Sequence, residues 1–285
     1  MTKYFFEHQA FASSPASHLF AIRTQSKYTA TKKDAIPLLF LGGSNSDFRT
    51  KRGLFSSPLL DYFDVISYDP RSQGRSQPLE GEWTMSDFAG DAAAILDAFG
   101  FAQAYIVGES FGAMTACEFA IVYPQRVKKM ALIVGAAGGA GGSSYPIERF
   151  LKLEGRERAI QSLSLQDTAF TSLLKRSPMQ AEAVIQKRIK NDSQFFSYAN
   201  NVSSYARLLA ARAAHDVYDR LHQISAPTLV ISGKRDQQAP LKVGKAMADN
   251  IPNSEFISID GGHGLAFETD KPSNILIKRW LDIEN

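Results

Sequence analysis

Cysteine, excess charge and long apolar runs are all scarce in this chain of 285 residues. The one cysteine, Cys117, excludes an intramolecular disulfide and a cysteine-based metal cluster. Lys and Arg number 32 against 29 Asp and Glu, and no basic stripe forms, so nucleic-acid binding is disfavoured. No apolar run reaches the ~18 residues of a membrane span, and the start lacks the apolar core of a signal peptide. We therefore expect a cytoplasmic protein that does not contact a membrane.

The chain does have enough apolar residues for a large core. Hydrophobic residues make up 44% of it, which suits one large domain or a domain with an insertion. Short apolar runs alternate with amphipathic segments, as in a parallel sheet built from βαβ units. Residues 84–87, T-M-S-D, predict a capping box at one helix start. The predicted strands are 4–11, 18–23, 36–41, 63–68, 104–107, 129–134, 227–232 and 255–259, and the predicted helices are 51–62, 84–99, 111–123, 241–250 and 271–283.

A glycine-rich run over residues 135–144 interrupts this alternation, and the chain from there to His222 is helical in composition. We expect residues 143–222 to form a helical cap inserted into a core domain of residues 1–142 and 223–285. A phosphate-binding loop is disfavoured because the run lacks the Lys-Ser/Thr ending and the G-x-G-x-x-G spacing. Residues 144–222 hold 12 Lys and Arg against 8 Asp and Glu. A neutral or anionic small-molecule substrate is therefore expected.

The strongest functional motif is G-E-S-F-G at residues 108–112, which lies between a β-branched apolar run and a helix-forming segment. A serine on a tight turn from strand to helix exposes its hydroxyl at the edge of the sheet, and glycines beside it avoid clashes. Such a pentapeptide arises by chance about once in seven chains of this composition. The position of the pentapeptide, where a predicted buried strand ends and a predicted helix begins, makes a chance match less plausible. We therefore expect Ser110 to be a nucleophile.

A nucleophilic serine needs a base, and the base needs a carboxylate that orients it. Among five histidines, His263 stands out because it follows a predicted strand within G-G-H-G at residues 261–264. Asp236 follows the predicted strand 227–232, so both side chains should reach the sheet edge where Ser110 lies. An ordinary turn histidine and a solvated turn aspartate are the alternatives. The sequence thus predicts a catalytic triad of Ser110, Asp236 and His263.

Acyl transfer also requires donors for an oxyanion, and backbone amides are the usual ones. The N–H of Phe111, directly after the nucleophile, is one candidate. The second should come from the loop after strand 36–41, where glycines allow close approach of the backbone. Ser44 is the predicted donor, and Gly43 is the alternative one residue earlier.

Taken together, these residues resemble the α/β-hydrolase superfamily, in its capped branch with a serine nucleophile. The order Ser110, Asp236, His263 matches that of the family, and D-P-R-S-Q-G-R-S at residues 69–76 is similar to its D-x-R-G-x-G-x-S segment. Ser72 replaces the usual glycine there, and the histidine often found before the oxyanion glycine is absent. The resemblance covers nearly the whole chain. It implies an α/β-hydrolase fold, with a central, mostly parallel eight-stranded sheet flanked by helices and an inserted helical cap.

The resemblance implies a metal-free serine hydrolase that cleaves a small ester, thioester, lactone or amide through an acyl-enzyme, without a cofactor. Relatives with an aspartate nucleophile, similar to haloalkane dehalogenases and epoxide hydrolases, are disfavoured by Ser110. An aminopeptidase similar to proline iminopeptidases is an alternative, although the loop after strand 36–41 lacks their H-G-G-P-G form. Carbon–carbon bond cleavage or a lyase step by the same triad is another, and a non-catalytic ligand-binding receptor is a third. A homodimer is left open.

The predicted cap contains several aromatic residues with two alternative roles. They either line the substrate pocket or hold the cap together, and packing is the commoner fate of a single aromatic side chain. These residues are Phe195, Phe196, Tyr198, Tyr205 and Tyr218.

Overall fold

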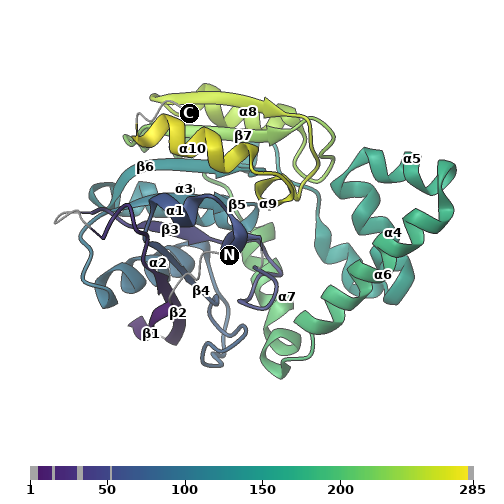
Figure 1. Ribbon diagram of the computed structural model, residues 1–285, viewed down its shortest axis with the longest axis horizontal. Helices are drawn as coiled ribbons and strands as arrows, with labels where there is room; N and C mark the ends of the chain where they lie inside the picture. Colours follow the sequence, from purple (N-terminus) through teal and green to yellow (C-terminus); the bar gives the residue numbers. More distant parts are fainter. Residues whose placement is uncertain (1–5, 15–16, 31–34, 52, 282–285) are drawn as a thin grey trace.

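The computed structural model describes residues 6–14, 17–30, 35–51 and 53–281, and its centre is one eight-stranded sheet (Figure 1). The strand order is β1-β2-β4-β3-β5-β6-β7-β8. The pairs β1–β2 and β2–β4 are antiparallel, and all other neighbours are parallel. The strands are β1 (Phe6–Ser14), β2 (Ser17–Thr24), β3 (Leu38–Leu41), β4 (Val65–Tyr68), β5 (Ala104–Glu109), β6 (Val127–Ile133), β7 (Thr228–Gly233) and β8 (Ser254–Ile259). The predicted mostly parallel, eight-stranded sheet is confirmed.

Helices cover both faces of this sheet and also form a separate group between β6 and β7. The α-helices are α1 (Leu59–Tyr62), α2 (Met85–Ala98), α3 (Phe111–Val122), α4 (Gly155–Gln166), α5 (Thr168–Arg176), α6 (Pro178–Phe195), α7 (Ala199–Ala213), α8 (Leu241–Asn250), α9 (Leu265–Glu268) and α10 (Lys271–Leu281). Short 3₁₀ helices span Leu54–Ser56, Pro124–Arg126, Gly139–Gly141, Ile147–Lys152 and Tyr218–Gln223.

The continuous apolar strands are buried on both faces, as their composition predicts. In β5, Ile106 packs into the apolar cluster shared with α2, α3 and α8, and the next residue, Val107, packs into the cluster shared with α1 and α10. Leu39 and Phe40 in β3 divide in the same way. This alternation is a consequence of the two-residue period of a strand. Because helices cover both faces of the sheet, the loops that carry Ser110, Asp236 and His263 meet at the carboxyl ends of the parallel strands.

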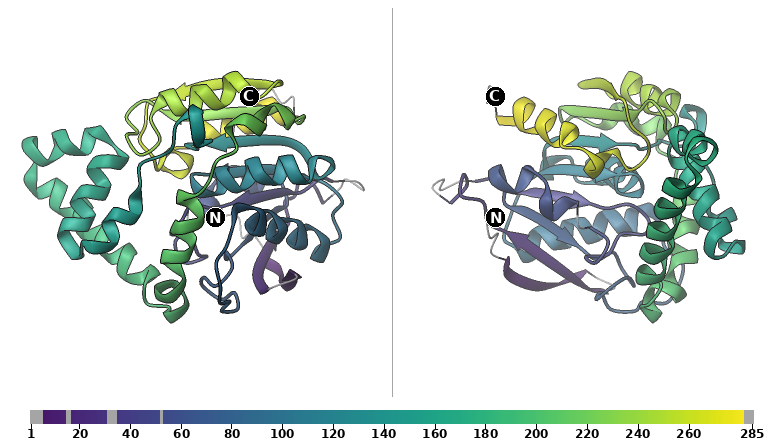
Figure 2. Two further views of the ribbon diagram at one scale, coloured as in Figure 1. Left: turned by 180° about the vertical axis from the view of Figure 1, so that it is seen from behind. Right: turned by 45° about the vertical axis from the view of Figure 1, so that its right-hand side comes forward.

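The helices of residues 143–222, which we call the insertion, lie to one side of the sheet (Figures 1 and 2). Helices α4, α5 and α6 share a small apolar cluster of their own that includes Ala159, Phe170 and Ile185. Helix α7 instead packs on the core, because Leu208 and Leu209 share a cluster with the starts of α2 and α3. Within the part of the chain that the structure describes, the insertion consists of helices and the loops between them and contains no strand, in agreement with its composition.

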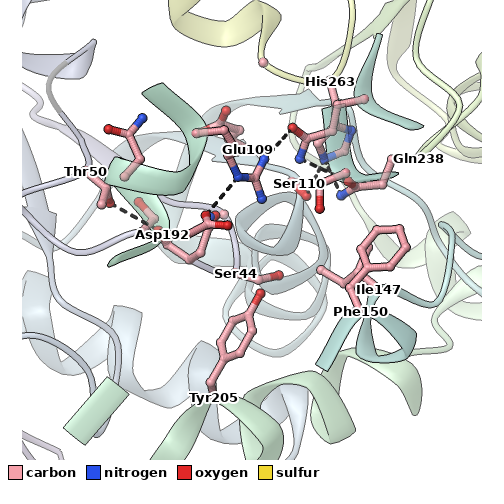
Figure 3. A pocket seen from close by; sticks show the side chains of 18 of the residues that line it. Ser44, Thr50, Glu109, Ser110, Ile147, Phe150, Asp192, Tyr205, Gln238 and His263 are labelled. Carbon is pink, nitrogen blue, oxygen red and sulfur yellow. Dashed lines mark hydrogen bonds and ion pairs between the residues drawn. The ribbon is translucent and has the colours of Figure 1, made fainter. Parts of the chain in front are cut away.

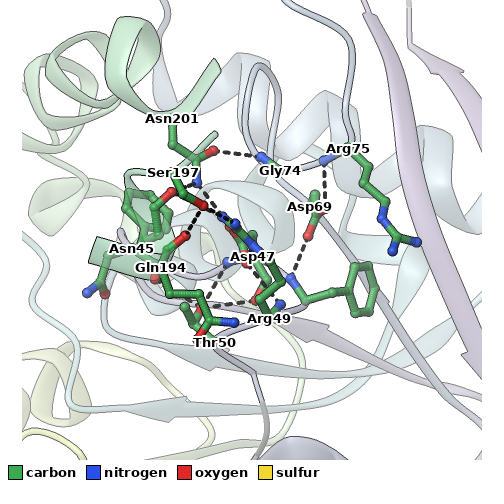
Figure 4. A network of polar contacts seen from close by, with 12 residues as sticks. Asn45, Asp47, Arg49, Thr50, Asp69, Gly74, Arg75, Gln194, Ser197 and Asn201 are labelled. Atoms are coloured by element: carbon green, nitrogen blue, oxygen red, sulfur yellow. Dashed lines mark hydrogen bonds and ion pairs between the residues drawn. The ribbon is translucent and has the colours of Figure 1, made fainter. Parts of the chain in front are cut away.

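Polar contacts attach the start of α7 to the loops after β3 and β4 (Figure 4). The fully buried Asn201 side chain accepts from Gly74 N at 2.7 Å and donates to Asp47 Oδ2 at 2.9 Å. Arg49, from the loop after β3, donates to Ser197 Oγ at 2.7 Å, and its guanidinium lies 3.7 Å from the Tyr198 ring centroid. These contacts hold one end of the insertion close to the predicted oxyanion loop.

Two local features of the chain correct or refine the sequence-based expectations. The predicted helix over residues 51–62 is wrong: a 3₁₀ turn and the four-residue α1 replace it, because Pro58 lacks the N–H that a continuous helix needs. Ser72, which departs from the glycine of the family pattern, has a φ of 57°, so it adopts the left-handed conformation that favours glycine. Its hydroxyl bonds the backbone of Leu79, which compensates for part of that cost.

Most other boundaries agree to within two or three residues, and the capping box at Thr84 and Asp87 is confirmed. Helix α9 was not predicted from the sequence. Parts of two predicted elements, residues 4–5 of the first strand and residues 282–283 of the last helix, lie outside the described residues. Within the described ranges, no helix is both long enough and apolar enough to cross a membrane.

Candidate active site

Ser110 occupies a sharp turn between β5 and α3. Its φ of 54° and ψ of −111° are uncommon for a residue other than glycine. The turn is fixed from both sides, because Ser110 N donates to Ile133 O of β6 and Ser110 O accepts from Ala113 N of α3. Backbone strain of this kind persists only where the surrounding structure enforces it, and it clusters at functional sites. The predicted turn from strand to helix is therefore present.

The glycines of the pentapeptide are required by close backbone approach. A Cβ at Gly112 would lie 1.9 Å from Leu41 O, and one at Gly108 would lie 2.4 Å from Gly112 O. Both of these oxygens belong to the backbone, which cannot move aside as a flexible side chain could. The two glycines thus let α3 begin directly against β3 and β5, which places Ser110 beside the loop after β3.

We expect Gly112→Ala to destabilise the protein by about 3 kcal/mol or more, because overpacking against a fixed carbonyl adds to the usual cost of small-to-large changes. Gly90→Ala is the matched control. It lies within α2, and its Cβ would meet only Tyr123 Oη at 3.9 Å, so we expect a gain of about 0.5–1 kcal/mol from helix propensity. Urea unfolding of both variants measures the difference, and equal stabilities would contradict this account of the turn.

The three predicted triad residues meet at the carboxyl ends of β5, β7 and β8. His263 Nε2 lies 2.8 Å from Ser110 Oγ, and His263 Nδ1 lies 2.7 Å from Asp236 Oδ2. The other oxygen of Asp236 accepts from Gln238 N at 2.7 Å and from Ala239 N at 2.9 Å. All three side chains are at least nine-tenths buried. With the carboxylate ionised, Nδ1 carries the imidazole proton and Nε2 presents its lone pair to the serine.

The two predicted sources of oxyanion donors lie next to the nucleophile. A Cβ at Gly43 would be 3.7 Å from Ser110 Cβ, and Ser44 follows in the same loop. Phe111 is the first residue of α3. The Ser44 side chain is buried and lines the pocket, and its hydroxyl has no hydrogen-bond partner among the described residues. Their role as donors, with the choice between Gly43 and Ser44, stays a prediction.

A cavity of about 450 Å³ opens onto Ser110 and His263, between the sheet and the insertion (Figure 3). This volume is in the range of small-molecule sites. Apolar walls come from Phe40 of β3 and from Ile147 and Phe150 at the start of the insertion. Figure 3 shows Ser110, His263 and Gln238 together at one end of the pocket, with Tyr205 and Phe150 on other walls.

Basic side chains of the insertion contribute to the same cavity. Arg158 of α4, together with Lys187 and Arg188 of α6, lines it. Arg188 donates to Asp192 Oδ1 at 2.8 Å and to Gln166 Oε1 at 2.9 Å, and Arg158 Nε lies 3.6 Å from Asp192 Oδ2. Two guanidinium groups thus share one carboxylate, so this wall of the pocket keeps a positive balance.

Lys51 is a further cation on the pocket wall, contributed by the core rather than by the insertion. Burial lowers the pKa of its ammonium from the usual value to about 8, against the opposing effect of the carboxylates of Asp69, Asp47 and Glu109. Its Nζ donates to the carbonyl of Tyr68. This buried amine therefore holds the loop after β3 against β4, underneath the pocket.

Sequence reasoning missed several pocket residues. Gln166, Arg188, Gln238 and Lys51 belong to no motif, and the positive surplus of residues 144–222 was the only signal of the arginines. The five aromatic residues divide between the two predicted roles. Phe196 and Tyr205 line the pocket. Phe195 is buried and packs against both of these rings, Tyr198 stacks on Arg49, and Tyr218 packs against the core.

This fold and this arrangement of side chains define a class of enzyme, and comparison with known families agrees. The model of the alpha/beta hydrolase fold family matches residues 36–270. The chain therefore belongs to this family, and we assign it to the hydrolases.

Relatives that are similar in sequence include two hydrolases that carry the same name. It is 30% identical over 226 residues, 77% of each chain, to the 2-hydroxy-6-oxononadienedioate/2-hydroxy-6-oxononatrienedioate hydrolase 2 of Pseudomonas putida. It is 32% identical over 203 residues, 68% of this chain and 67% of the relative, to the corresponding hydrolase of Paraburkholderia phymatum.

Solved structures with the same fold include an enol-lactonase from Burkholderia xenovorans LB400, with a TM-score of 0.71 and 21% identity over 96% of this chain and 98% of that one. A meta-cleavage product hydrolase from Pseudomonas fluorescens IP01 gives a TM-score of 0.75 and 18% identity, over 97% of this chain and 98% of that one. At these identities the likeness concerns the fold.

Proposed function

We propose that this protein is a serine hydrolase in which Ser110 attacks the carbonyl carbon of a small, carboxylate-bearing acyl compound and forms an acyl-enzyme. The observation that carries the proposal is the continuous contact from Ser110 Oγ through His263 to Asp236, at 2.8 and 2.7 Å, at the end of a cavity of about 450 Å³. A strained serine, a buried base and an oriented carboxylate are the parts that acyl transfer requires.

In the proposed mechanism, His263 Nε2 takes the proton of Ser110 as Oγ bonds to the substrate carbonyl carbon. The oxygen gains negative charge, and the backbone amides of Phe111 and of Ser44 or Gly43 are the proposed donors to it. Asp236 stabilises the imidazolium, which then protonates the leaving group. Water attacks the acyl-enzyme by the same steps in reverse and releases the acid.

In this proposal the insertion, residues 143–222, acts as a cap that selects substrates. It supplies the apolar residues Ile147 and Phe150 and the cations Arg158 and Arg188 to the pocket. Arginine recognises carboxylates through paired N–H donors. A substrate with an apolar acyl segment and a terminal carboxylate therefore fits better than a neutral or cationic one.

A second candidate function is hydrolysis of a carbon–carbon bond in a 2-hydroxy-6-oxo dienoate. It is favoured by the names of relatives at 30% and 32% identity, both of which are hydrolases of dienedioates. After the 2-hydroxy diene tautomerises to its 2-oxo form, Ser110 would attack the 6-oxo carbonyl carbon while His263 takes the serine proton. The carbon–carbon bond would then break with its electron pair delocalised into the 2-oxo group as a dienolate, which takes up a proton. The triad geometry suits both reactions.

A small panel of substrates separates these candidates. It contains the neutral ester p-nitrophenyl butyrate, the anionic ester mono-p-nitrophenyl succinate, an aliphatic lactone, proline p-nitroanilide and a 2-hydroxy-6-oxo dienedioate. We expect the anionic ester to exceed the neutral one in kcat/KM. A dienedioate rate far above every ester would favour the second candidate, and turnover of the anilide alone would contradict both.

Arg188→Met should lower kcat/KM for mono-p-nitrophenyl succinate by about 10- to 100-fold, because a charge-assisted hydrogen bond to a carboxylate contributes about 1.5–3 kcal/mol. The neutral butyrate ester has no carboxylate that could accept a hydrogen bond from Arg188, so its kcat/KM should not fall. Arg176→Met is a matched control, since Arg176 is an exposed arginine at the end of α5. An equal loss on both esters would contradict the proposed anion site.

A further inference from the structure

His263 Nε2 has two hydrogen-bond neighbours at one lone pair. Ser110 Oγ lies at 2.8 Å and the side-chain amide nitrogen of Gln238 lies at 2.7 Å. Nδ1 carries the ring proton toward Asp236, so Nε2 can only accept. Gln238 is buried, at 4% exposure, beside the pocket that it lines. Two donors therefore compete for the atom that must take the serine proton.

The orientation of the Gln238 amide is fixed from the insertion. Arg188 can only donate, so the oxygen of Gln166 must face its Nη1 at 2.9 Å. This places Gln166 Nε2 toward Gln238 Oε1, at 3.3 Å, and Gln238 Nε2 consequently faces His263. The donors run in one direction, from the guanidinium of α6 through two amides to the imidazole.

The backbone links α4 to the triad loops independently of this relay. His263 N donates to Gln166 O at 2.6 Å, and Gln237 N donates to Leu165 O at 3.0 Å. Nearby, Arg235 is paired with Asp167 at 2.8 Å and also with Asp260. None of these bonds uses the side chain of Gln166 or Gln238. Changing either side chain therefore leaves the end of α4 attached and the charges around His263 in place.

We propose that Gln238 is a positioning residue that occupies the lone pair of His263 until an anionic group of the substrate engages Arg188. The proposal rests on the serine-hydrolase function proposed above. A carboxylate that takes Arg188 Nη1 removes the donor that orients Gln166, and both amides are then able to turn. The lone pair becomes available to Ser110, so the cap couples recognition of the anion to activation of the base.

This coupling has a chemical reason. Once His263 accepts the serine proton, Nε2 becomes a donor and can no longer accept from the Gln238 amide. A Gln238 side chain held in place would then present a donor to a donor and oppose formation of the imidazolium. A substrate without an anion would have to displace Gln238 without help, which lowers its rate of reaction.

The test is the rate at which a neutral fluorophosphonate labels Ser110. In that reaction Ser110 Oγ bonds to phosphorus, the P–F bond breaks, fluoride leaves, and the serine proton passes to His263 Nε2. Gln238→Met keeps the length of the side chain and removes the competing donor, so we expect labelling to be about 3- to 10-fold faster, the equivalent of one hydrogen bond. Gln166→Met, which releases Gln238 and keeps the backbone bond from His263 N to residue 166, should change the rate in the same direction.

Two esters supply the second readout. In Gln238→Met, kcat for p-nitrophenyl butyrate should rise with little change in KM, while kcat for mono-p-nitrophenyl succinate should stay the same. Gln237→Met, an exposed neighbour, is the matched control and should match the wild-type protein. Labelling of Gln238→Met at or below the wild-type rate would overturn the proposal. Failure of the serine-hydrolase function itself is seen separately, as absence of labelling at Ser110 in the wild-type protein.

Discussion

Ser110→Ala is expected to lower kcat on the true substrate by on the order of 10⁶-fold, the loss seen when other serine enzymes lose their nucleophile. Ser110 Oγ is the only atom of the proposed site that bonds to the substrate, so no neighbour compensates for it. The site should keep its shape, because the strained turn is held by the backbone bonds to Ile133 and Ala113. Steady-state kinetics on the preferred ester measures the change.

Thermal unfolding supplies the control for this variant. We expect the Tm of Ser110→Ala to equal that of the wild-type protein or exceed it slightly. The serine hydroxyl makes one hydrogen bond, to His263 Nε2, and the amide of Gln238 can keep that atom bonded when the hydroxyl is removed. Activity within about tenfold of wild type in a folded Ser110→Ala protein would rule out Ser110 as the nucleophile.

Asp236→Asn should cost roughly 10⁴-fold in kcat, because an asparagine amide in contact with Nδ1 stabilises the wrong tautomer of His263. The Asn carbonyl can still accept from the amides of Gln238 and Ala239, at the position where Asp236 Oδ1 accepts from them at 2.7 and 2.9 Å. The NH₂ group then faces His263, so Nδ1 must accept and Nε2 carries the proton. The imidazole can no longer take the proton of Ser110.

Asp260→Asn is the matched control for this change. Asp260 directly follows β8 and is paired with Arg235, and 69% of its side chain is exposed. Removing this carboxylate should therefore leave kcat near the wild-type value. If Asp236→Asn also kept a near-normal rate, another carboxylate would have to orient the base.

Much of the fold could be predicted because its signals are local. The run from Tyr105 to Val107 is apolar and β-branched, and in the structure it is buried on both faces by different helices. The proximity of the three candidate triad residues could also be predicted, because topology brings the carboxyl ends of parallel strands to one edge. Ser110, Asp236 and His263 each follow such a strand, so their positions in the sequence were enough to bring them together.

Other features depend on contacts between distant segments. The segment 51–62 has a helix-forming composition, but Pro58 and the burial of Lys51 against the Tyr68 carbonyl give it a different path. The relay to His263 joins Arg188 and Gln166 of the insertion to Gln238 of the core, across sequence separations of 22 and 72 residues. Glutamine carries no charge and matches no motif, so nothing in the sequence marks it.

The insertion is fixed to the core on both sides of the pocket. The end of α4 is bonded to the loops of Asp236 and His263, and the start of α7 is bonded through Asn201 to the loop after β3. The insertion therefore contacts the loop of His263 on one side and the predicted oxyanion loop on the other. If it acts as the proposed cap, a change in its contacts with the substrate has a direct path to both loops.

The central claim is that Ser110 is the residue that forms the covalent intermediate. Labelling of the wild-type protein with a fluorophosphonate, followed by mass spectrometry of the digested protein, tests this directly. The account predicts one adduct per chain, located on Ser110, and none in Ser110→Ala. An adduct on another serine, or equal labelling of the Ser110→Ala protein, would contradict it.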